Sequence, residues 1–579
     1  MHFFLRNILL VSLLLIITFS VIKCGSNVEK QKDNVITDQK TFRNLDSNVK
    51  YVGATACRQC HYDKFETFIE TGMGKSFDHA SKKKSSAKFD KHAIIYDKFS
   101  DLSYLPFWFG DSMKIMEFRL EGKDTVHKRI ETVDYIIGSG QHTNSHIFNT
   151  NGYLHQMPMT YYTQEGKWDM PPGFENGSNT RFSRKIGLEC MSCHNALPNL
   201  EKGSENKFSS VPNGISCERC HGPGEIHVKE KTAGIVVDTS KYIDYSIVNP
   251  AKLSIDLQFD VCQRCHLQGN SVLKEGKSFL DFKPGMKLSD VMSIFLPKYD
   301  GADDEFIMAS HADRLKMSEC FIKAEGKSQK AEGSSLRPHK NALTCITCHN
   351  PHVSVRVTGK EVFNSACKNC HTGATQVSCS EKPEIRNKKL DNCVSCHMPR
   401  SGSIDIPHVT VTDHYIRKPV KKTNIASVKK FIGLVAINEK NPDPKVKAEA
   451  YINQYEKFDH KAAFLDSAKK HLNEKSKTDL DLLIRLHFLK NDFKKIAVLT
   501  SDLSSEWLKR KRALTTIKMP GLATASRKHI TILENQIRRI HSIKKQWNWL
   551  LITWSFRISW QVTCLPRANC YKQKRYMKY

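Results

Sequence analysis

The sequence predicts a mainly α fold with many loops, in which bound prosthetic groups replace much of an ordinary core. Three observations predict this class: a five-residue motif that recurs seven times, a stretch of alternating polarity after its first copy, and a C-terminal stretch with helical apolar spacing. The chain has 579 residues, 40% of them hydrophobic and 26% charged, which is enough for several folded domains.

The N-terminus is typical of an export signal. The apolar run from Ile8 to Ile22 is shorter than the roughly 20 residues that a membrane-spanning helix needs. We assign residues 1–23 to a signal peptide or lipoprotein signal and 24–50 to a polar tether. Cys24 resembles the lipidated cysteine of a bacterial lipoprotein, although Lys23 stands where a small residue is preferred. Lipidation, simple cleavage and an uncleaved anchor stay open, and each predicts a periplasmic or outer-membrane-anchored protein.

The recurring motif is C-x-x-C-H, in a chain with 19 cysteines and 25 histidines. Thiols at this spacing reach the two vinyl groups of one porphyrin, and the histidine that follows becomes the proximal iron ligand. Zinc knuckles work in pairs and, like disulfides, need no trailing histidine. The motif therefore predicts seven covalent haem c groups, attached at Cys57, Cys60 and His61; Cys190, Cys193 and His194; Cys217, Cys220 and His221; Cys262, Cys265 and His266; Cys345, Cys348 and His349; Cys367, Cys370 and His371; and Cys393, Cys396 and His397.

Several motifs lie so close together in the sequence that too few residues separate them to form an apolar pocket around each haem. The copies that start at residues 345, 367 and 393 follow one another directly. Stacked c-type haems are therefore expected to organise the fold, packed against one another. Outside the motifs, the sequence allows Cys320 and Cys379 either to form a disulfide or to stay as lone thiols.

Histidines outside the motifs are candidates for the sixth iron ligand. Bis-histidine iron is an electron carrier, whereas an open sixth position binds substrate. His352 follows His349 across a proline and is expected to point toward a neighbour's haem. His227 follows the third motif through a Gly-Pro-Gly turn, and His408 and His414 follow the last motif.

Segments between the motifs carry a family resemblance. They are Tyr51-Val52-Gly53, Ser76-Phe77-Asp78-His79-Ala80, Ile137-Gly138-Ser139-Gly140-Gln141-His142, Trp168-Asp169-Met170-Pro171-Pro172-Gly173-Phe174, the stretches Cys217 to His227, Leu343 to His352 and Cys393 to Pro399, and Asp413-His414. Residues 51–419 resemble large multihaem cytochromes c related to the tetrahaem cytochrome of ammonia oxidation and, more distantly, to hydroxylamine oxidoreductase. Members of this family often carry C-terminal tetratricopeptide repeats.

The resemblance implies distal-ligand or haem-pocket positions at His79, His142, His227, His352 and His414. Of these, His142 also suits a position facing a substrate pocket. No tyrosine here matches the one that is cross-linked to haem in hydroxylamine oxidoreductase, so that chemistry is not carried over. Related octahaem enzymes often have one more haem than the motifs counted here.

The remaining segments predict smaller units. Alternating stretches within residues 89–167 predict a small β insertion between the first and second motifs, inside the multihaem domain of residues 51–419. Residues 420–505 predict a helical segment, either tetratricopeptide-like or a plain bundle packed on the haem domain. Residues 506–579 form a basic, Trp-rich tail, interpreted as disordered, as frameshifted, or as a membrane-surface segment.

The formal charge of +29 does not indicate a nucleic-acid binder, because export argues against one. Seven haems would add up to about 14 propionate charges, which leaves about +15. The first functional hypothesis is electron transfer between redox partner proteins. The alternative is a haem-dependent reductase or oxidase of a small nitrogen or sulfur compound, in which a basic pocket attracts an anionic substrate.

Overall fold

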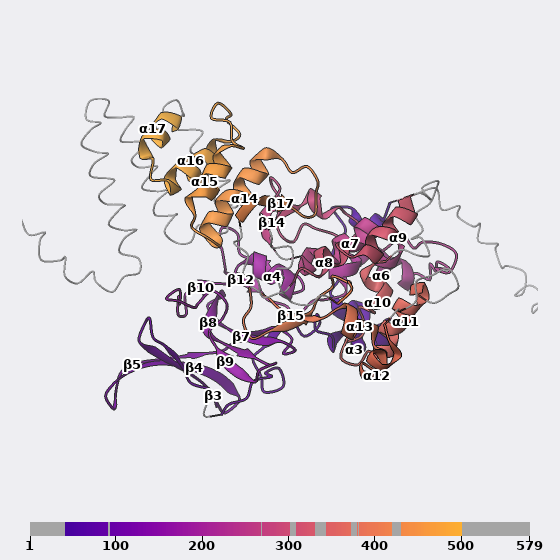
Figure 1. The fold of residues 1–579 in the computed structure, drawn as a ribbon, viewed down its shortest axis with the longest axis horizontal. Helices are drawn as coiled ribbons and strands as arrows, with labels where there is room; N and C mark the ends of the chain where they lie inside the picture. The colour runs from indigo at the N-terminus through magenta and orange to yellow at the C-terminus, as the bar shows by residue number, and fades with distance from the viewer. Residues whose placement is uncertain are drawn as a thin grey trace, which may run out of the picture.

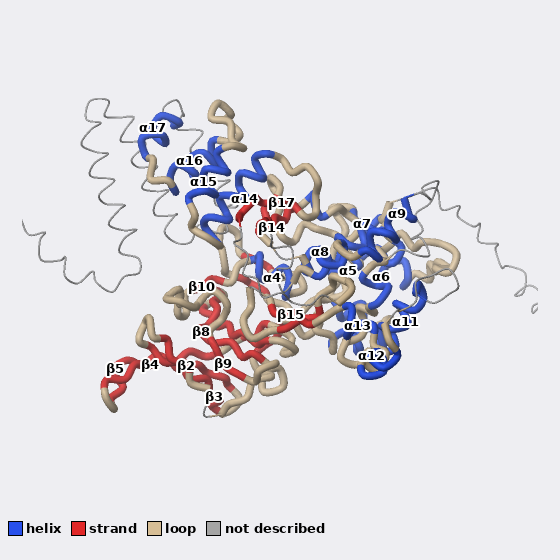
Figure 2. The backbone as a smooth tube through the Cα atoms, in the orientation of Figure 1, coloured by secondary structure: helices blue, strands red, loops and turns tan. Residues whose placement is uncertain are grey.

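A computed structural model describes residues 41–90, 93–267, 269–300, 309–329, 343–371, 379, 381–403, 405–419 and 430–500. Figure 1 shows three regions: a strand-rich lobe, a region of short helices, and a helical C-terminal layer. Figure 2 separates them by element type, because the strands gather mainly in the first lobe while short helices joined by long loops make up the second.

The strand-rich lobe contains two antiparallel sheets. The first has the order β1-β6-β7-β8-β10, with β9 also paired to β8. Its strands are β1 (Phe77–His79), β6 (Tyr135–Ile137), β7 (Thr143–Thr150), β8 (Tyr153–Tyr162), β9 (Lys167–Asp169) and β10 (Arg184–Lys185). The second sheet has the order β2-β3-β4-β5 and comprises β2 (Ile95–Asp97), β3 (Leu102–Phe109), β4 (Ser112–Glu121) and β5 (Asp124–Thr132).

Alternating side chains explain how these two sheets pack. Along β4, Met113, Ile115 and Glu117 are fully buried while the residues between them are not. Successive side chains of a strand point to opposite faces, so one face of β4 enters the core. That core also contains Tyr104 from β3 and Trp168 from β9, which places it between the two sheets.

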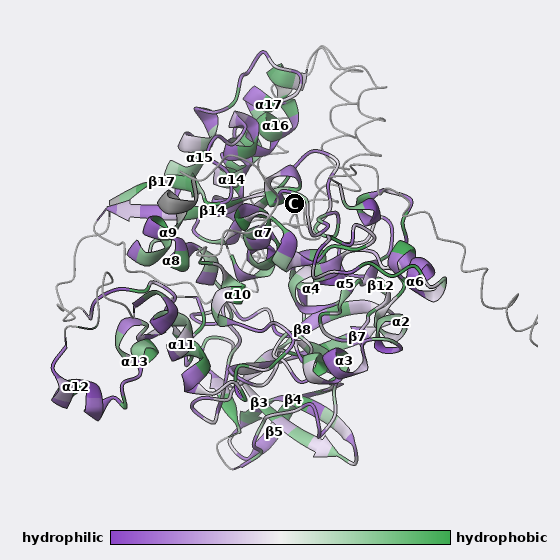
Figure 3. Cartoon of the chain, turned by 90° about the vertical axis from the view of Figure 1, so that its right-hand side faces the viewer, coloured by the Kyte–Doolittle hydropathy of each residue, from purple (hydrophilic) through white to green (hydrophobic). Residues whose placement is uncertain are grey.

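The region of short helices carries the seven motifs. The motif helices are α2 (Ala54–Arg58), α4 (Leu188–His194), α5 (Glu218–His221), α7 (Ile255–His266), α10 (Cys345–Cys348), α11 (Lys360–His371) and α13 (Cys393–His397). Between them lie α3 (Tyr62–Ile69), α6 (Glu225–Thr232), α8 (His311–Lys316), α9 (Glu319–Gln329) and α12 (Pro383–Lys388), with 3-10 turns η1 (Arg43–Leu45), η2 (Pro250–Lys252) and η3 (Leu288–Asp290). Figure 3 shows hydrophilic and hydrophobic residues interleaved along these helices, and α12 as mostly hydrophilic.

Three further sheets lie outside the predicted insertion. They pair β11 (Asn199–Leu200) with β12 (Phe208–Ser210), β15 (Arg400–Gly402) with β16 (Thr410–Thr412), and β13 (Asn270–Leu273) with β14 (Met292–Asp300) and β17 (Lys430–Ala436). Helices α14 (Pro444–Lys457), α15 (Ala462–Lys469), α16 (Leu480–Leu489) and α17 (Phe493–Thr500) follow β17. Phe295 of β14 and Leu434 of β17 share a buried cluster with Tyr451, Phe464 and Leu486 of these helices. The C-terminal helices are therefore packed on the haem-motif region through this sheet.

The prediction of a mainly α fold is wrong. Strands make up 22% of the structure and helices 32%, in five antiparallel sheets among the described residues. The prediction failed because β14 and β17 lie far apart in sequence, so neither shows its pairing partner locally. The β insertion is also larger than the small unit predicted within residues 89–167, since its two sheets span residues 77–185.

Some predictions fall outside the described residues. They are the signal at residues 1–23, the lipidation site at Cys24, most of the 24–50 tether, and the 506–579 tail. Within the described ranges no helix combines the length and the apolar character required to cross a bilayer.

Candidate haem-binding sites

All seven motifs lie at or within a short helix. One helical turn brings both thiols to the same side of the backbone and places the histidine directly after them. The amide N–H of His61, His221 and His349 donates to the carbonyl of the first cysteine of its own motif, at 2.9 to 3.0 Å. The described cysteines are all free thiols, Cys320 and Cys379 included. This geometry suits two thioether bonds and one axial imidazole for each motif.

Pairs of histidine rings stand opposite one another at the spacing of two axial ligands. Metal–imidazole bonds are about 2 Å long, so two imidazoles on opposite sides of one iron have ring centroids about 6 Å apart. Three pairs of rings have this spacing: His61 with His227 at 6.3 Å, His221 with His352 at 6.0 Å, and His349 with His414 at 6.1 Å. Each pair joins one motif histidine to one histidine outside the motifs, so the residues present fit haem c.

The distal histidine of each pair follows a different motif. His227 follows the third motif but faces the first, and His352 follows the fifth but faces the third. His414 follows the seventh motif and faces the fifth. The first, third, fifth and seventh motifs therefore form a ladder in which each supplies the partner ring for the one before it.

Hydrogen bonds determine which ring nitrogen of these histidines is free to bind a metal. Nδ1 of His221 donates to the Val248 carbonyl at 2.8 Å, and Nδ1 of His414 donates to the Thr412 carbonyl at 3.0 Å. Nδ1 of His227 lies 2.9 Å from the Ser246 hydroxyl, whose own proton goes to Asp244. A proton on Nδ1 leaves Nε2 as the metal-binding nitrogen.

Burial keeps several of these rings neutral, as an iron ligand must be. It lowers the pKa of His221, where a hydrogen bond to Val248 opposes the shift. It also lowers the pKa of His414 to about 4, aided by the charge of nearby His349.

His311 is a candidate ligand that the sequence analysis did not single out. Its ring lies 5.4 Å from that of His266 in the fourth motif, at an interplanar angle of 88°. The His311 ring also lies 4.7 Å from that of His414. Its position at the start of α8, far from any motif, gave no local signal. The only hint in the sequence was its membership of the set of histidines outside the motifs.

Thiol contacts join different motifs. The thiols of four pairs lie close enough to shift each other's pKa: Cys57 with Cys217, Cys193 with Cys265, Cys262 with Cys345, and Cys367 with Cys393. The charge of Cys265 raises the pKa of Cys220, and that of Cys348 raises the pKa of Cys367, so these thiols are also near one another. The motifs thus adjoin in the order first, third, fourth, fifth, sixth, seventh, with the second beside the fourth.

Three predicted histidine positions have other surroundings. His79, on β1, is exposed and packs its ring 4.8 Å from Tyr135. Nδ1 of His142 accepts from the Gln164 amide at 2.8 Å, which leaves the proton on Nε2. The orientation of that amide is fixed, because Gln164 also exchanges two hydrogen bonds with the backbone of Thr410.

His408 has both ring nitrogens occupied. Nδ1 lies 2.8 Å from Glu165, and Nε2 lies 3.0 Å from Asp169. Its backbone also adopts a φ of 60°. In this arrangement neither nitrogen is available to a metal. Ligation by His79, His142 or His408 stays a prediction that the described contacts do not support.

His194 of the second motif has a different environment again. Its ring is buried, its Nδ1 has no hydrogen-bond partner, and no other imidazole ring stacks on it within the described ranges. Burial, and secondly the charge of Lys84, lower its pKa to about 4. The Lys84 amine donates to the carbonyls of Gly138, at 2.7 Å, and Lys75.

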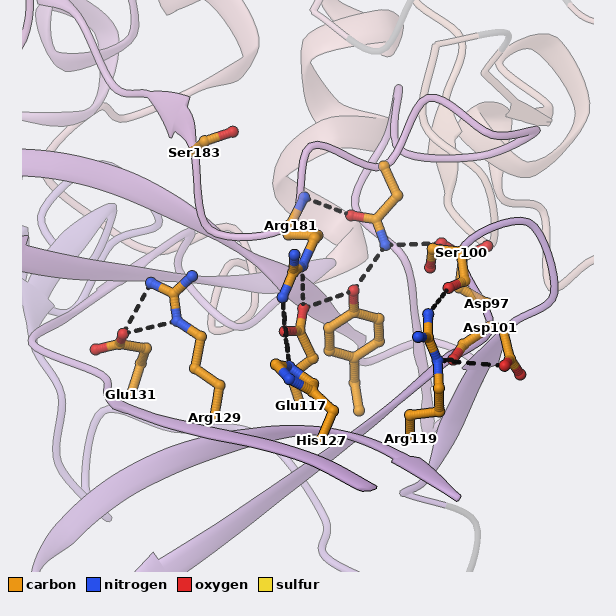
Figure 4. Close-up of polar contacts among 12 residues, drawn as sticks. Asp97, Ser100, Asp101, Glu117, Arg119, His127, Arg129, Glu131, Arg181 and Ser183 are labelled. Atoms are coloured by element: carbon orange, nitrogen blue, oxygen red, sulfur yellow. Dashed lines mark hydrogen bonds and ion pairs between the residues drawn. The ribbon is translucent and has the colours of Figure 1, made fainter. Parts of the chain in front are cut away.

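A polar network on the β lobe was also missed by sequence reasoning. Glu117 is fully buried and accepts from Arg181, His127 and Tyr104 (Figure 4). Asn179 donates to the Tyr104 hydroxyl at 3.0 Å. The network ties the loop between β9 and β10 to the second sheet, so its role is to hold the two sheets of the lobe together.

Comparisons with known proteins place part of the chain among cytochromes. Residues 173–222, which include the second and third motifs, match the family model described as cytochrome c554 and c-prime. The chain is also 25% identical over 198 residues to multiheme cytochrome MtrA of Shewanella baltica (strain OS185), covering 33% of this chain and 54% of that protein. The chain is similar to multihaem c-type cytochromes. It spans about half the length of this curated relative.

One solved structure was also found, the crystal structure of the outer cell wall cytochrome OcwA. The match covers 77% of this chain and 99% of that chain, at 15% identity and a TM-score of 0.38. That score is too low to establish a common fold. None of these comparisons names hydroxylamine oxidoreductase or tetratricopeptide repeats, so those two parts of the predicted resemblance stay predictions.

Proposed function

We propose that this protein is an exported cytochrome with seven covalent haem c groups, which carries electrons between redox partner proteins in the periplasm or at the outer membrane. The observation that carries this proposal is that facing histidine rings link the first, third, fifth and seventh motifs, while the thiols of the other motifs lie close enough to this series to share pKa shifts with it. Electron transfer is faster the closer two centres lie, so such a series favours conduction along the chain.

Haem c bound at these motifs supplies reversible one-electron chemistry at its iron. The chain itself supplies the axial imidazoles and sets their orientation. His227, His352 and His414, together with His311, give four motifs a second imidazole. Two imidazole ligands leave no position for a substrate, which suits a carrier rather than a catalyst.

The charge of the chain suits acidic partners. The basic excess of +29 is larger than the charge that the haem propionates would offset. We propose that the remaining basic surface attracts an acidic redox protein, and that residues 1–23 direct export with Cys24 as the lipid anchor.

A coulometric titration of the purified holoprotein tests this function. The protein is reduced stepwise and then mixed with a one-electron acceptor in a stopped-flow instrument. We expect about seven electrons per chain, delivered in a reaction that empties all haems together. Uptake of fewer electrons, or a subset of haems that neither reduces nor reoxidises with the rest, would contradict conduction through the series.

A second candidate function is reduction or oxidation of a small nitrogen or sulfur compound at the second motif. The specific observation is that His194 lacks a facing imidazole in the described ranges, while the Lys84 amine lies nearby. A five-coordinate iron beside a cationic side chain would suit a small anion.

Electron paramagnetic resonance separates the two functions. A high-spin ferric signal that shifts on addition of nitrite or hydroxylamine supports the enzyme, provided that the Lys84→Met variant binds nitrite more weakly than the parent protein. Lys75→Met is the matched control, because Lys75 is exposed and paired with Glu70. A purely low-spin spectrum that ignores both compounds supports the carrier alone.

A further inference from the structure

Two candidate distal histidines are neighbours but face different motifs. The rings of His311 and His414 lie 4.7 Å apart. His311 faces His266 of the fourth motif, and His414 faces His349 of the fifth. The thiols of Cys262 and Cys345, one from each of these motifs, also lie close enough to shift each other's pKa. Whatever holds His311 and His414 together therefore acts on two adjoining haem sites at once.

A buried ion pair connects the segments that carry the two rings. Arg314 lies three residues after His311, on the same face of α8. Its Nε donates to Asp413 Oδ1 at 2.9 Å, and its second donor contacts Asp413 Oδ2 at 2.5 Å. Asp413 directly precedes His414. Both side chains are only 3% exposed, which makes this ion pair among the most deeply buried of those described.

Further contacts tie the pair to the backbone on both sides. The Tyr415 amide donates to Asp413 Oδ1 at 3.0 Å, and the Asp413 amide donates to the Pro399 carbonyl just after the seventh motif. The Ser318 hydroxyl lies between the two segments, accepting from the Ile416 amide at 2.9 Å. The carboxylate therefore has little freedom to reorient once Arg314 has engaged it.

The energetics of this pair point to positioning. A buried ion pair is weak support for stability, because the desolvation of both charges offsets their attraction. A guanidinium bound to a carboxylate through two parallel hydrogen bonds does fix the mutual orientation of the segments that carry them. That orientation is what two side-by-side ligands for two irons require.

We propose that Arg314 and Asp413 form a positioning clamp that holds His311 and His414 as one unit, so that the sixth ligands of the fourth-motif and fifth-motif haems are set together. The inference rests on the proposed haem ligation. Breaking the clamp should open both sixth positions, although neither Arg314 nor Asp413 touches an iron.

Carbon monoxide binding to the reduced holoprotein counts open positions, because it binds only ferrous haem whose sixth site is free. We expect Arg314→Met to bind about two more molecules per chain than the parent protein, with a matching rise in the high-spin ferric signal. Arg314→Lys keeps the charge but loses the two-pronged geometry, and is expected to open the same positions in part. Arg386→Met is the control, because Arg386 on α12 forms an exposed ion pair with Asp391.

Single-ligand variants separate failure of the clamp from failure of the ligation. His311→Ala and His414→Ala should each add about one carbon monoxide site. If neither does, the proposed ligation is wrong. If both do while Arg314→Met folds, keeps its haems and adds none, the clamp is refuted.

A double variant guards against a misfolded single one. Removing Arg314 alone leaves a buried, uncompensated carboxylate, whereas Arg314→Met with Asp413→Leu removes both charges. We expect the double variant to fold, load its haems and still show about two additional sites. A double variant that keeps both positions closed would overturn the proposal.

Discussion

Replacing His352 with alanine tests whether a distal ligand crosses from one motif to another. The His352 ring lies 6.0 Å from that of His221, at an interplanar angle of 16°, and three residues after His349 in its own motif. The account predicts that His352→Ala opens the third-motif haem and leaves the fifth-motif haem closed by His414.

The size of the effect follows from the structure. One iron of seven loses its sixth ligand, so about one seventh of the total haem absorbance should change from low-spin to high-spin and about one more carbon monoxide should bind per chain. The fold should tolerate the change. His352 is half-buried and its ring meets that of Phe68 only at an edge. The hydrogen bond from its backbone amide to the Asn350 side chain does not depend on the imidazole. We therefore expect the free energy of unfolding to fall by only about 1 kcal/mol.

The assay pairs His352→Ala with removal of single haems. Cysteine-to-serine changes at Cys217 and Cys220 remove the third haem, and should abolish the added carbon monoxide site. The same changes at Cys345 and Cys348 remove the fifth haem and should leave the added site in place. The opposite pattern would show that His352 binds the haem of its own motif and would refute the ladder.

Three further predictions follow from other parts of the molecule. Burial raises the pKa of Glu117, but hydrogen bonds from Arg181 and His127 outweigh this effect and leave that pKa below the usual 4.5. The ionised Glu117 side chain therefore contributes to stability above pH 4.5, and this contribution is lost as the pH falls further. Glu117→Gln should flatten this acid limb in hydrogen-exchange measurements of the β lobe, and an unchanged limb would contradict it. Leu434→Asp should release the C-terminal helices, seen as faster proteolysis after residue 430, because Leu434 of β17 is buried in one cluster with Tyr451 of α14. Cys24→Ala should abolish incorporation of labelled palmitate, and labelling that persists would exclude Cys24 as the anchor.

The haem-attachment residues could be predicted from sequence because their chemistry is local. Each motif carries its own cysteines and histidine within five residues, at or beside a short helix. The predictions for His352 and His227 also rest on local sequence. A proline or a Gly-Pro-Gly turn follows their motifs and directs the chain away from its own haem.

Features that depend on distant pairing could not be predicted. His311 meets His266 only because α8 packs beside α7, and Arg314 meets Asp413 across nearly a hundred residues. The β13-β14-β17 sheet was not predicted for the same reason, because its edge strand β17 comes from beyond the last motif. The His408 prediction has the reverse difficulty: its sequence position suits a ligand, but Glu165 and Asp169 contact both of its ring nitrogens, so the described contacts do not support it.

Intact mass spectrometry of the exported protein, beside a haem count by alkaline pyridine absorbance, tests the central claim most directly. The account predicts about seven haems per chain and a mass that exceeds the mature polypeptide by that number of covalently bound groups. A colourless protein with the mass of bare polypeptide, made in cells with a working cytochrome maturation system, would contradict it.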